Sequence, residues 1–310
     1  VDHPLTPTDL SFVRNHFAIP PLDPATWRLR VDGAVRQVLD LTLAEIQSLP
    51  ARELVVTLEC AGNGRTGLDP VPPGVPWGYG AVSALVFTGV PLAALLEQAG
   101  LEAGAVEILF TGADRGPVEG GAVEPFARSL PVSVALHPDT LLAWAVNAHP
   151  LPAEHGFPLR LVVPRWYGMA SVKWLVRITA LSEPFFGYFP SQHYRYLSAG
   201  GGEPGDGEPV RLIRVSSLIG RPTAGQTLTL GPVEVRGLAW SGHGPIARVE
   251  ISADDGTTWH RARLESPPSP YAPARWSWLW QPRRPGRYVL LSRAWDAAGN
   301  TQPLQPAWNR

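Results

Sequence analysis

The chain of 310 residues contains a single cysteine, Cys60. One thiol cannot form an internal disulfide framework, and alone it cannot supply the roughly four ligands of a zinc site or an iron–sulfur cluster. The sequence also lacks the Cys-x-x-Cys-His motif that attaches haem. A lone cysteine is commonly a small buried hydrophobe. Two chemical roles stay open, namely one thiolate on a metal whose other ligands come from elsewhere, or the nucleophile of a hydrolase.

Long apolar runs are absent as well. No run reaches the roughly 18 residues of a membrane span, and no signal-peptide pattern is present. The formal net charge of -1 gives no electrostatic reason to expect a nucleic-acid partner. With 45% hydrophobic residues and a length that allows two domains, a globular protein is expected. Because the chain begins with Val1 rather than methionine, we expect any targeting segment to be missing from it, and the compartment, periplasmic or cytoplasmic, stays open.

The cysteine lies where an apolar run meets a loop. Leu54–Leu58 is rich in apolar and β-branched residues, as a buried strand would be, and a glycine-rich segment around Asn63 then breaks the run. Loops held by a rigid strand commonly carry ligands and reactive groups. Clustered glycines let backbone N–H groups turn toward an anion, and Arg65 adds a fixed positive charge. The pattern therefore favours a functional role for Cys60.

Lysine and methionine are almost absent. The only lysine is Lys173 and the only methionine is Met169, and both lie in the segment 166–174. An ammonium is a compact point donor, whereas guanidinium is a planar fork, so the two do not replace each other freely at a tight anion site. A composition bias toward arginine is one explanation for this pattern, and a lysine kept at such an anion site is the other.

Four motifs together resemble a known family. They are Phe12-Val-Arg-Asn-His16, Thr57-Leu-Glu-Cys-Ala-Gly-Asn63, His155-Gly-Phe-Pro-Leu-Arg160 and Ser171-Val-Lys-Trp-Leu175. In this order they resemble the haem-free bacterial type of the sulfite oxidase family of molybdopterin oxidoreductases, and the resemblance covers nearly the whole chain. It implies a Mo-molybdopterin cofactor, with Cys60 as the one protein ligand of a molybdenum that the dithiolene of molybdopterin otherwise holds.

The resemblance also implies the site residues. The residues expected to bind the cofactor are Arg14, Asn15, His16, Cys60, Asp114, His155, Arg160, Ser171 and Lys173. The residues expected to act in catalysis are Cys60, Arg14, Arg65 and Tyr194, with Tyr196 as the alternative tyrosine. A phosphate-bearing cofactor needs donors that stay cationic, which arginine and lysine supply. A turn position would explain Asp114 without any ligand, and an isolated loop histidine such as His155 is commonly only a hydrogen-bonded polar group.

Short strands and few helices predict an α+β, strand-rich first domain. Strands are expected at 106–111, 140–146 and 172–181, the last carrying Lys173. A hairpin is expected within 27–38 around Asp32-Gly33, and helices at 42–49 and 91–98. The segment 198–209 reads Ser-Ala-Gly-Gly-Gly-Glu-Pro-Gly-Asp-Gly-Glu-Pro and predicts a flexible linker. The predicted division is therefore 1–197, a molybdopterin-binding catalytic domain, then the linker 198–209, then 210–310.

Residues 210–310 contain alternating runs separated by turns, which predicts an immunoglobulin-like antiparallel β-sandwich. The runs are 228–230, 233–240, 247–253, 275–281 and 288–295. Trp276, Trp278 and Trp280 alternate and should face one side of a strand. In the family this domain dimerises, so a homodimer is expected. The family also has an arginine from this region near the substrate, and Arg275 is the candidate here.

The activity that the resemblance implies is oxidation of sulfite, or a similar small oxyanion, to sulfate by oxygen-atom transfer, with electrons passed to an external acceptor such as a cytochrome or oxygen. One departure bears on the substrate, because Gly64 stands where many members carry an arginine before Arg65. A related molybdenum oxidoreductase acting on nitrate or a sulfoxide is the first alternative. A cysteine hydrolase pairing Cys60 with His155 or His16, and an adhesion module built on the sandwich, are the others.

Overall fold

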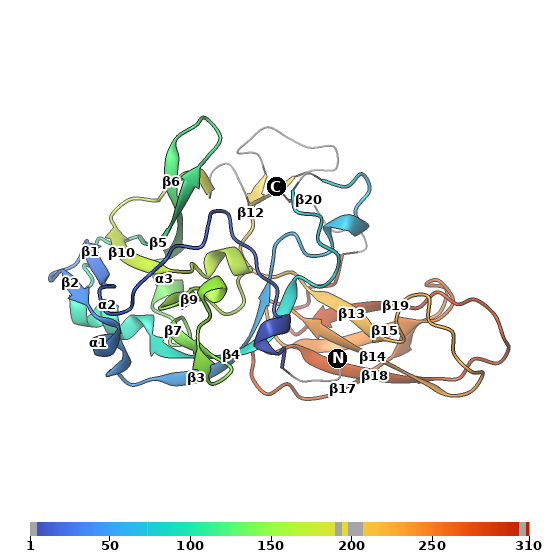
Figure 1. The fold of residues 1–310 in the computed structure, drawn as a ribbon. Helices are drawn as coiled ribbons and strands as arrows, with labels where there is room; N and C mark the ends of the chain where they lie inside the picture. The colour runs from blue at the N-terminus through green and yellow to red at the C-terminus, as the bar shows by residue number, and fades with distance from the viewer. Residues whose placement is uncertain (1–4, 73, 190–193, 198–206, 304–307, 310) are drawn as a thin grey trace.

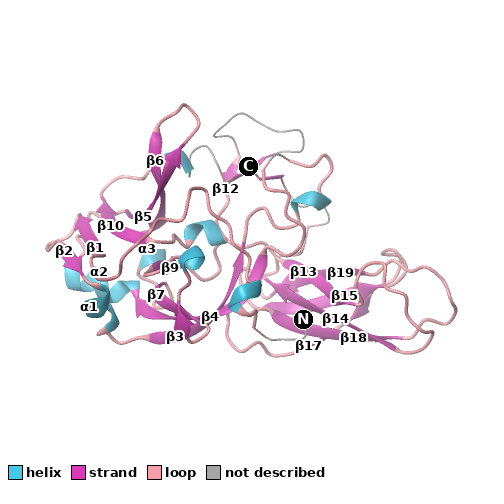
Figure 2. Ribbon diagram, in the orientation of Figure 1, coloured by secondary structure: helices cyan, strands magenta, loops and turns pink. Residues whose placement is uncertain are grey.

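The computed structural model describes residues 5–72, 74–189, 194–197, 207–303 and 308–309. Strands predominate and the helices are short (Figure 2). The sheets and helices of the N-terminal part form one body, and the orange and red strands form a second, elongated body beside it (Figure 1). The predicted class, a strand-rich α+β part followed by a β-sandwich, is confirmed. Among the helices in these ranges, none has the length and apolarity needed to cross a membrane.

The first sheet has the order β2-β1-β10-β5-β6. Its strands are β1 (Leu29–Gly33), β2 (Leu39–Leu41), β5 (Glu107–Pro117), β6 (Val123–Pro131) and β10 (Leu175–Leu181). Strand β5 is longer than the sequence pattern predicts, because residues 112–116 continue it through a register shift between Thr111 and Arg115. The predicted end of this strand at residue 111 was therefore wrong, since glycines in a strand can mark a bulge as well as a turn.

The second sheet has the order β3-β4-β7-β8, with β9 also paired to β7. Its strands are β3 (Arg52–Glu59), β4 (Val82–Pro91), β7 (Leu141–Val146), β8 (His149–Pro150) and β9 (Arg160–Val162). The strands predicted at 54–58 and 140–146 are confirmed as β3 and β7. Strand β3 ends at Glu59, so the predicted position of Cys60 directly after a strand is also confirmed.

Capping residues mark the start of the first α-helix and the end of the second. They are α1 (Leu43–Gln47), α2 (Leu92–Ala99) and α3 (Val132–Ala135), with single turns of 3-10 helix at η1 (Thr8–Leu10), η2 (Arg65–Gly67), η3 (Ala153–His155) and η4 (Gly168–Ala170). Thr42 and Glu45 form the expected capping box of α1. Gly100 ends α2 in the left-handed conformation that glycine adopts without steric cost. Both predicted helices are therefore confirmed.

The C-terminal sandwich pairs one sheet, β13-β14-β18-β17, with a second, β16-β15-β19. Their strands are β13 (Ser216–Arg221), β14 (Val233–Trp240), β15 (Ile246–Ser252), β16 (His260–Arg261), β17 (Arg263–Leu264), β18 (Ala274–Trp280) and β19 (Leu291–Asp296). The run 233–240 is confirmed at both ends, and the runs near β15, β18 and β19 are confirmed with shifted boundaries. The run 228–230 forms no strand, and β13 was missed.

A small sheet, β12-β11-β20, joins the two parts of the chain. It comprises β11 (Arg195–Leu197), β12 (Glu208–Pro209) and β20 (Trp308–Asn309). Residues 198–206 of the predicted linker lie outside the described residues, while its last two residues form β12. The division into 1–197, 198–209 and 210–310 stays a prediction.

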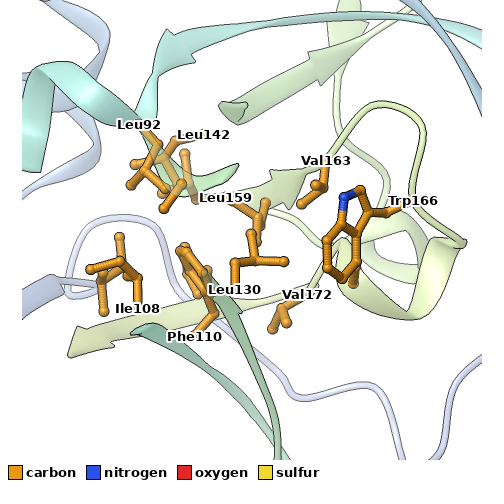
Figure 3. Packing of buried hydrophobic residues seen from close by; sticks show 14 of the residues in the cluster. Leu92, Ile108, Phe110, Leu130, Leu142, Leu159, Val163, Trp166 and Val172 are labelled. Carbon is orange, nitrogen blue, oxygen red and sulfur yellow. The ribbon is translucent and has the colours of Figure 1, made fainter. Parts of the chain in front are cut away.

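The main core lies between the two N-terminal sheets and helix α2. Figure 3 shows Phe110 and Leu130 of the first sheet near Leu159, with Val163 beside Trp166. The same cluster extends to Trp240 of β14, so the sandwich shares apolar core with the N-terminal part. A separate cluster fills the sandwich. There Trp276 is buried with Trp278 and Trp280 packed beside it, which confirms that the three face one side.

Asp32 ties together strands that are distant in sequence. Its carboxylate lies 2.7 Å from Nε of Arg30 and 2.8 Å from Nη2 of Arg177, and it accepts a hydrogen bond of 2.9 Å from the Thr179 hydroxyl. Arg177 and Thr179 belong to β10, which runs parallel to β1. Asp32 is therefore a strand residue rather than a turn residue, and the hairpin turn predicted at Asp32-Gly33 lies instead in residues 34–38. The local Asp-Gly signal could not show this partner from β10.

Replacing Asp32 with asparagine should lower the free energy of unfolding at pH 7 by about 1–2 kcal/mol, because charge-assisted bonds to Arg177 and Arg30 are lost. These partners lower the pKa of Asp32 from its ordinary 3.8 against an opposing effect of burial. The stabilisation is therefore present above pH 3.8 and is lost as the pH falls below it. Urea unfolding at pH 7 and pH 3 measures this difference.

The control for Asp32→Asn is Glu234→Gln, because Glu234 forms an exposed ion pair with Arg236. That change should alter the free energy of unfolding by less than about 0.5 kcal/mol at either pH. Equal effects of the two substitutions at pH 7 would contradict the role assigned to Asp32.

Candidate functional site

One cavity collects residues from seven separate stretches of the chain. Its empty space measures about 760 Å³, including the part that is open to solvent. All the predicted site residues except Arg65 line it, namely Arg14, Asn15, His16, Cys60, Asp114, His155, Arg160, Ser171, Lys173 and Tyr194. Tyr196, the alternative tyrosine, does not line it. Tertiary structure therefore gathers the sequence motifs into a single site.

Cys60 enters this cavity at the end of β3. Its backbone N–H donates to the carbonyl of Ala81 at 2.9 Å, which fixes the start of the loop. The Gly62 N–H donates to Sγ at 3.4 Å, so a loop amide does turn toward the sulfur. Burial raises the pKa of the thiol, and the Gly62 amide opposes that shift. Among the described residues no histidine bonds the sulfur, so the paired thiolate–imidazole of a cysteine hydrolase is not formed.

Asn63 and Glu59 hold the two ends of the cysteine loop together. Asn63 donates from Nδ2 to Glu59 at 2.9 Å and accepts from the Ala81 N–H at 3.0 Å. Trp240 of the sandwich donates from Nε1 to the other oxygen of Glu59 at 2.8 Å. Burial raises the pKa of Glu59 to about 7, with both hydrogen bonds opposing the shift. A side chain of the C-terminal part therefore helps to position the residue before Cys60.

Arg160 is a buried cation without a described carboxylate partner. It is 4% exposed, and its guanidinium donates to the carbonyls of His155 at 3.0 Å and Ser171 at 3.2 Å. Desolvation lowers its pKa to about 10, so it remains charged at neutral pH. Burial of an unpaired charge is costly unless a ligand of opposite sign offsets it.

Lys173 adds a second cation to the same wall. Its ammonium donates to Asn15 Oδ1 and, at 2.7 Å, to the carbonyl of Glu154. Burial, together with nearby Arg160, lowers the pKa of Lys173 to about 7. Lys173 lies two residues before β10 rather than on it, so its predicted place on a strand was wrong. Gly156, at φ +105°, leaves space between Lys173 and Arg160 that a side chain would fill.

Asp114 contributes a buried carboxyl group to the cavity. It is 4% exposed, and its Oδ1 has no hydrogen-bond partner among the described residues. Burial raises the pKa of Asp114 to about 6, against the smaller effect of Lys173. A buried polar atom without a partner is uncommon in folded proteins. An acceptor beside uncompensated cations fits a cofactor that carries both phosphate and N–H groups, as molybdopterin does.

Another group of cavity residues combines hydroxyl, imidazole and aromatic side chains. Nε2 of His16 lies 2.5 Å from the hydroxyl of Tyr194, and the His16 ring stacks on Phe126 with centroids 5.3 Å apart. Burial raises the pKa of Tyr194 to about 12, so the phenol stays protonated at neutral pH. Tyr194 also adopts φ 56°, a backbone conformation that is strained for this residue type and frequent at functional sites.

Arg65 lies on another side of the cysteine loop. It lines a neighbouring cavity, between this loop and the sandwich, together with Gly64, Tyr79 and Trp240. Its guanidinium donates to the carbonyl of Val75 at 3.3 Å. Burial lowers its pKa, and Cys60 and Tyr194 are close enough to oppose that shift. A catalytic role for Arg65 therefore stays a prediction. Arg275 lies away from both cavities, 3.7 Å from Glu265 on the sandwich.

Several residues of the site could not be identified from sequence. Phe126 and Trp174 line the main cavity, and Arg128 lies beside Tyr194. Only Trp174 had a local signal, because it adjoins Lys173. In the described part of the chain no cluster of three histidine, cysteine or acidic side chains could hold a metal ion. A metal at Cys60 would need its other ligands from a non-protein group.

Two family models match the chain. The oxidoreductase molybdopterin binding domain matches residues 16–189, and the Mo-co oxidoreductase dimerisation domain matches residues 209–310. Sulfite oxidase from Gallus gallus is 37% identical over 325 aligned residues, which cover 98% of this chain and 70% of that protein. Mitochondrial sulfite oxidase from Homo sapiens is 37% identical over 325 residues, with 98% and 59% covered.

Two further similarities broaden the comparison. Nitrate reductase [NAD(P)H] from Hordeum vulgare is 35% identical over 335 residues, covering 98% of this chain and 37% of that protein. The crystal structure of the sulfane dehydrogenase SoxCD from Paracoccus pantotrophus superposes with a TM-score of 0.84 at 29% identity, covering 96% and 74% of the two chains. The chain therefore spans about 59% of the human sulfite oxidase and a smaller share of the nitrate reductase.

Substituting Gly156 with alanine should weaken cofactor retention about tenfold. The added Cβ would lie 3.0 Å from Cβ of Lys173 and 3.1 Å from Cβ of Arg160, at a φ that costs about 1–2 kcal/mol for other residues. Gly104→Ala is the control, since nothing lies within 4 Å of its added methyl. The measurement is the molybdopterin content per chain of each purified variant. Equal content in the two variants would contradict the cofactor role of this wall.

Proposed function

Because the chain belongs to the sulfite oxidase family of molybdopterin oxidoreductases, we propose that it catalyses molybdenum-dependent oxidation of sulfite to sulfate. The observation that carries the proposal is the cation-lined cavity at Cys60, which gathers ten of the eleven residues expected from the family resemblance. The substrate is a small oxyanion, and the electrons pass to an external acceptor.

The residues present fit Mo-molybdopterin. Arg160, Lys173 and His155 would face its phosphate and pterin, Asp114 has an unused acceptor atom, and Cys60 offers one soft thiolate. When bound, the cofactor supplies the oxygen-atom transfer and takes up the two electrons. The protein supplies anchoring, orientation and electric field.

The remaining cavity residues would orient the oxyanion. Arg14 is a fixed cation beside Cys60, and the Tyr194 phenol keeps its proton at neutral pH. The bond between His16 and Tyr194 holds the hydroxyl in place, and the stacked Phe126 holds the imidazole. Preorganised donors of this kind stabilise charge that develops on the substrate oxygens. Phe126 and Trp174 add apolar surface to the same cavity.

The sandwich has two proposed roles. Its match to a dimerisation domain supports a homodimer. Through Trp240 it also holds Glu59, next to Cys60. A cytochrome or oxygen is the proposed electron acceptor.

Cys60→Ser should abolish sulfite-dependent reduction of ferricyanide while the protein stays folded, because serine replaces the soft thiolate with a neutral hydroxyl. The assay is run on protein whose molybdopterin content has been measured, so that lost cofactor and lost chemistry are separated. Nitrate reduction by reduced protein serves as the matched test of the alternative. Sulfite turnover that persists in the serine variant, or wild-type protein that reduces nitrate and ignores sulfite, would overturn the proposal.

Arg65→Ala should lower kcat/KM for sulfite by about 10²-fold if its guanidinium reaches the developing anion in the loaded enzyme. Arg28→Ala, which removes an exposed arginine, is the control. The measurement is kcat/KM for sulfite of both variants at one ionic strength. Unchanged sulfite kinetics in Arg65→Ala would remove Arg65 from the site.

A further inference from the structure

Arg128 is a buried arginine that no motif identified. It lies on β6, two residues after Phe126, and points to the same face of that strand as Phe126 does. Only 5% of the residue is exposed. Its Nε and Nη1 have no hydrogen-bond partner among the described residues. Two unused donors on one buried guanidinium are exceptional, because buried polar groups are normally paired.

The contacts of Arg128 lead to the main cavity. Its Cζ lies 5.5 Å from the ring centroid of Tyr194, a cation–π distance. The hydroxyl of the same tyrosine bonds His16, and both residues line the cavity with Cys60. Burial lowers the pKa of Arg128 to about 10, so it stays cationic at neutral pH. Glu107 is close enough to favour the charged form but forms no ion pair with it.

An isolated buried cation has a physical cost. Packing alone would favour an apolar side chain at this position, because a guanidinium needs partners once it leaves water. The ring of Tyr194 satisfies only part of that need. A charge kept at such a cost beside a ligand cavity indicates that its field acts on an anion bound in that cavity.

The loop that follows Cys60 carries one positive charge fewer than it does in many family members. Gly64 stands where many family members carry an arginine, and its φ is +77°. A Cβ at Gly64 would lie 3.0 Å from the ring of Tyr79, so a side chain there would require this exposed ring to shift. The loop therefore contributes one guanidinium, from Arg65, rather than two.

We propose that Arg128 is a positioning and specificity-determining residue, which holds Tyr194 and supplies to the oxyanion site a positive charge that the cysteine loop lacks. The inference rests on the proposed function for the identity of the oxyanion. What it adds is that Arg128 helps the site to recognise a doubly charged tetrahedral or pyramidal oxyanion. Arg128 acts through Tyr194 and through its field. It takes no part in bond making.

Three variants test this inference in the molybdopterin-loaded protein. Arg128→Met removes the charge and keeps the length, Arg128→Lys keeps the charge and loses the fork, and Arg211→Met removes an exposed arginine whose charge Arg128 senses. The measurements are sulfate affinity by calorimetry, sulfite kcat and KM, and the melting temperature. Sulfate binding needs no turnover, so it tests the site independently of the reaction.

Arg128→Met is expected to weaken sulfate binding and raise the KM for sulfite about tenfold, with a smaller change in kcat. Its melting temperature should be unchanged or higher, because an unpaired buried charge has been removed. Arg128→Lys should retain sulfate binding within about threefold of wild type, and Arg211→Met should match wild type.

The outcomes separate this inference from the proposed function. Sulfate affinity that is absent in wild type or unchanged in Arg128→Met overturns the inference even where sulfite is oxidised. A lowered melting temperature without rescue by lysine also overturns it, in favour of a packing role. Wild-type protein that binds sulfate through Arg128 but does not oxidise sulfite retains the inference and removes the proposed function.

Discussion

Buried positive charge without a protein counter-ion is the constraint around which this structure is organised. Arg160 gives its donors to backbone carbonyls, Lys173 to Asn15 and a carbonyl, and neither meets a carboxylate within ion-pair distance among the described residues. Such charges are tolerated in a folded protein when a bound anion completes them. The unused acceptor of Asp114 and the space at Gly156 belong to the same cavity wall. A phosphate-bearing, N–H-bearing cofactor satisfies all of these groups together.

The position of Cys60 depends on contacts from both parts of the chain. Strand β3 delivers the cysteine, Asn63 closes its loop, and Trp240 bonds Glu59 from the sandwich. Along the same strand, the Thr57 N–H donates at 2.8 Å to the carbonyl of Tyr271, which also belongs to the C-terminal part. The sandwich thus covers the edge of β3 as well as sharing apolar core with the first part. The part of the chain that matches a dimerisation domain therefore also positions the residue before Cys60.

Local patterns predicted what depends on neighbouring residues in the chain. The capping box at Thr42, the glycine that ends α2 and the alternation of Trp276, Trp278 and Trp280 each reflect short-range geometry, and each is confirmed. The wrong predictions concern residues whose structure depends on contacts with distant segments of the chain. Asp32 looks like a turn residue until β10 brings Arg177 to it, and Gly112 looks like a loop residue until β6 pairs across the bulge in β5. The family motifs located the cavity residues, but Arg128 has no motif, since its meaning comes only from burial and from the ring of Tyr194.

The central claim is that this cavity holds Mo-molybdopterin with Cys60 as a ligand of the metal. X-ray absorption at the molybdenum K edge of the purified protein tests it most directly, by counting the sulfur neighbours of the metal. The account predicts three sulfur neighbours in wild type, two from the dithiolene and one from Cys60, and two in the Cys60→Ser protein. Two sulfur neighbours in both proteins would contradict it, as would purified wild-type protein, loaded in a host that makes the cofactor, that contains no molybdenum.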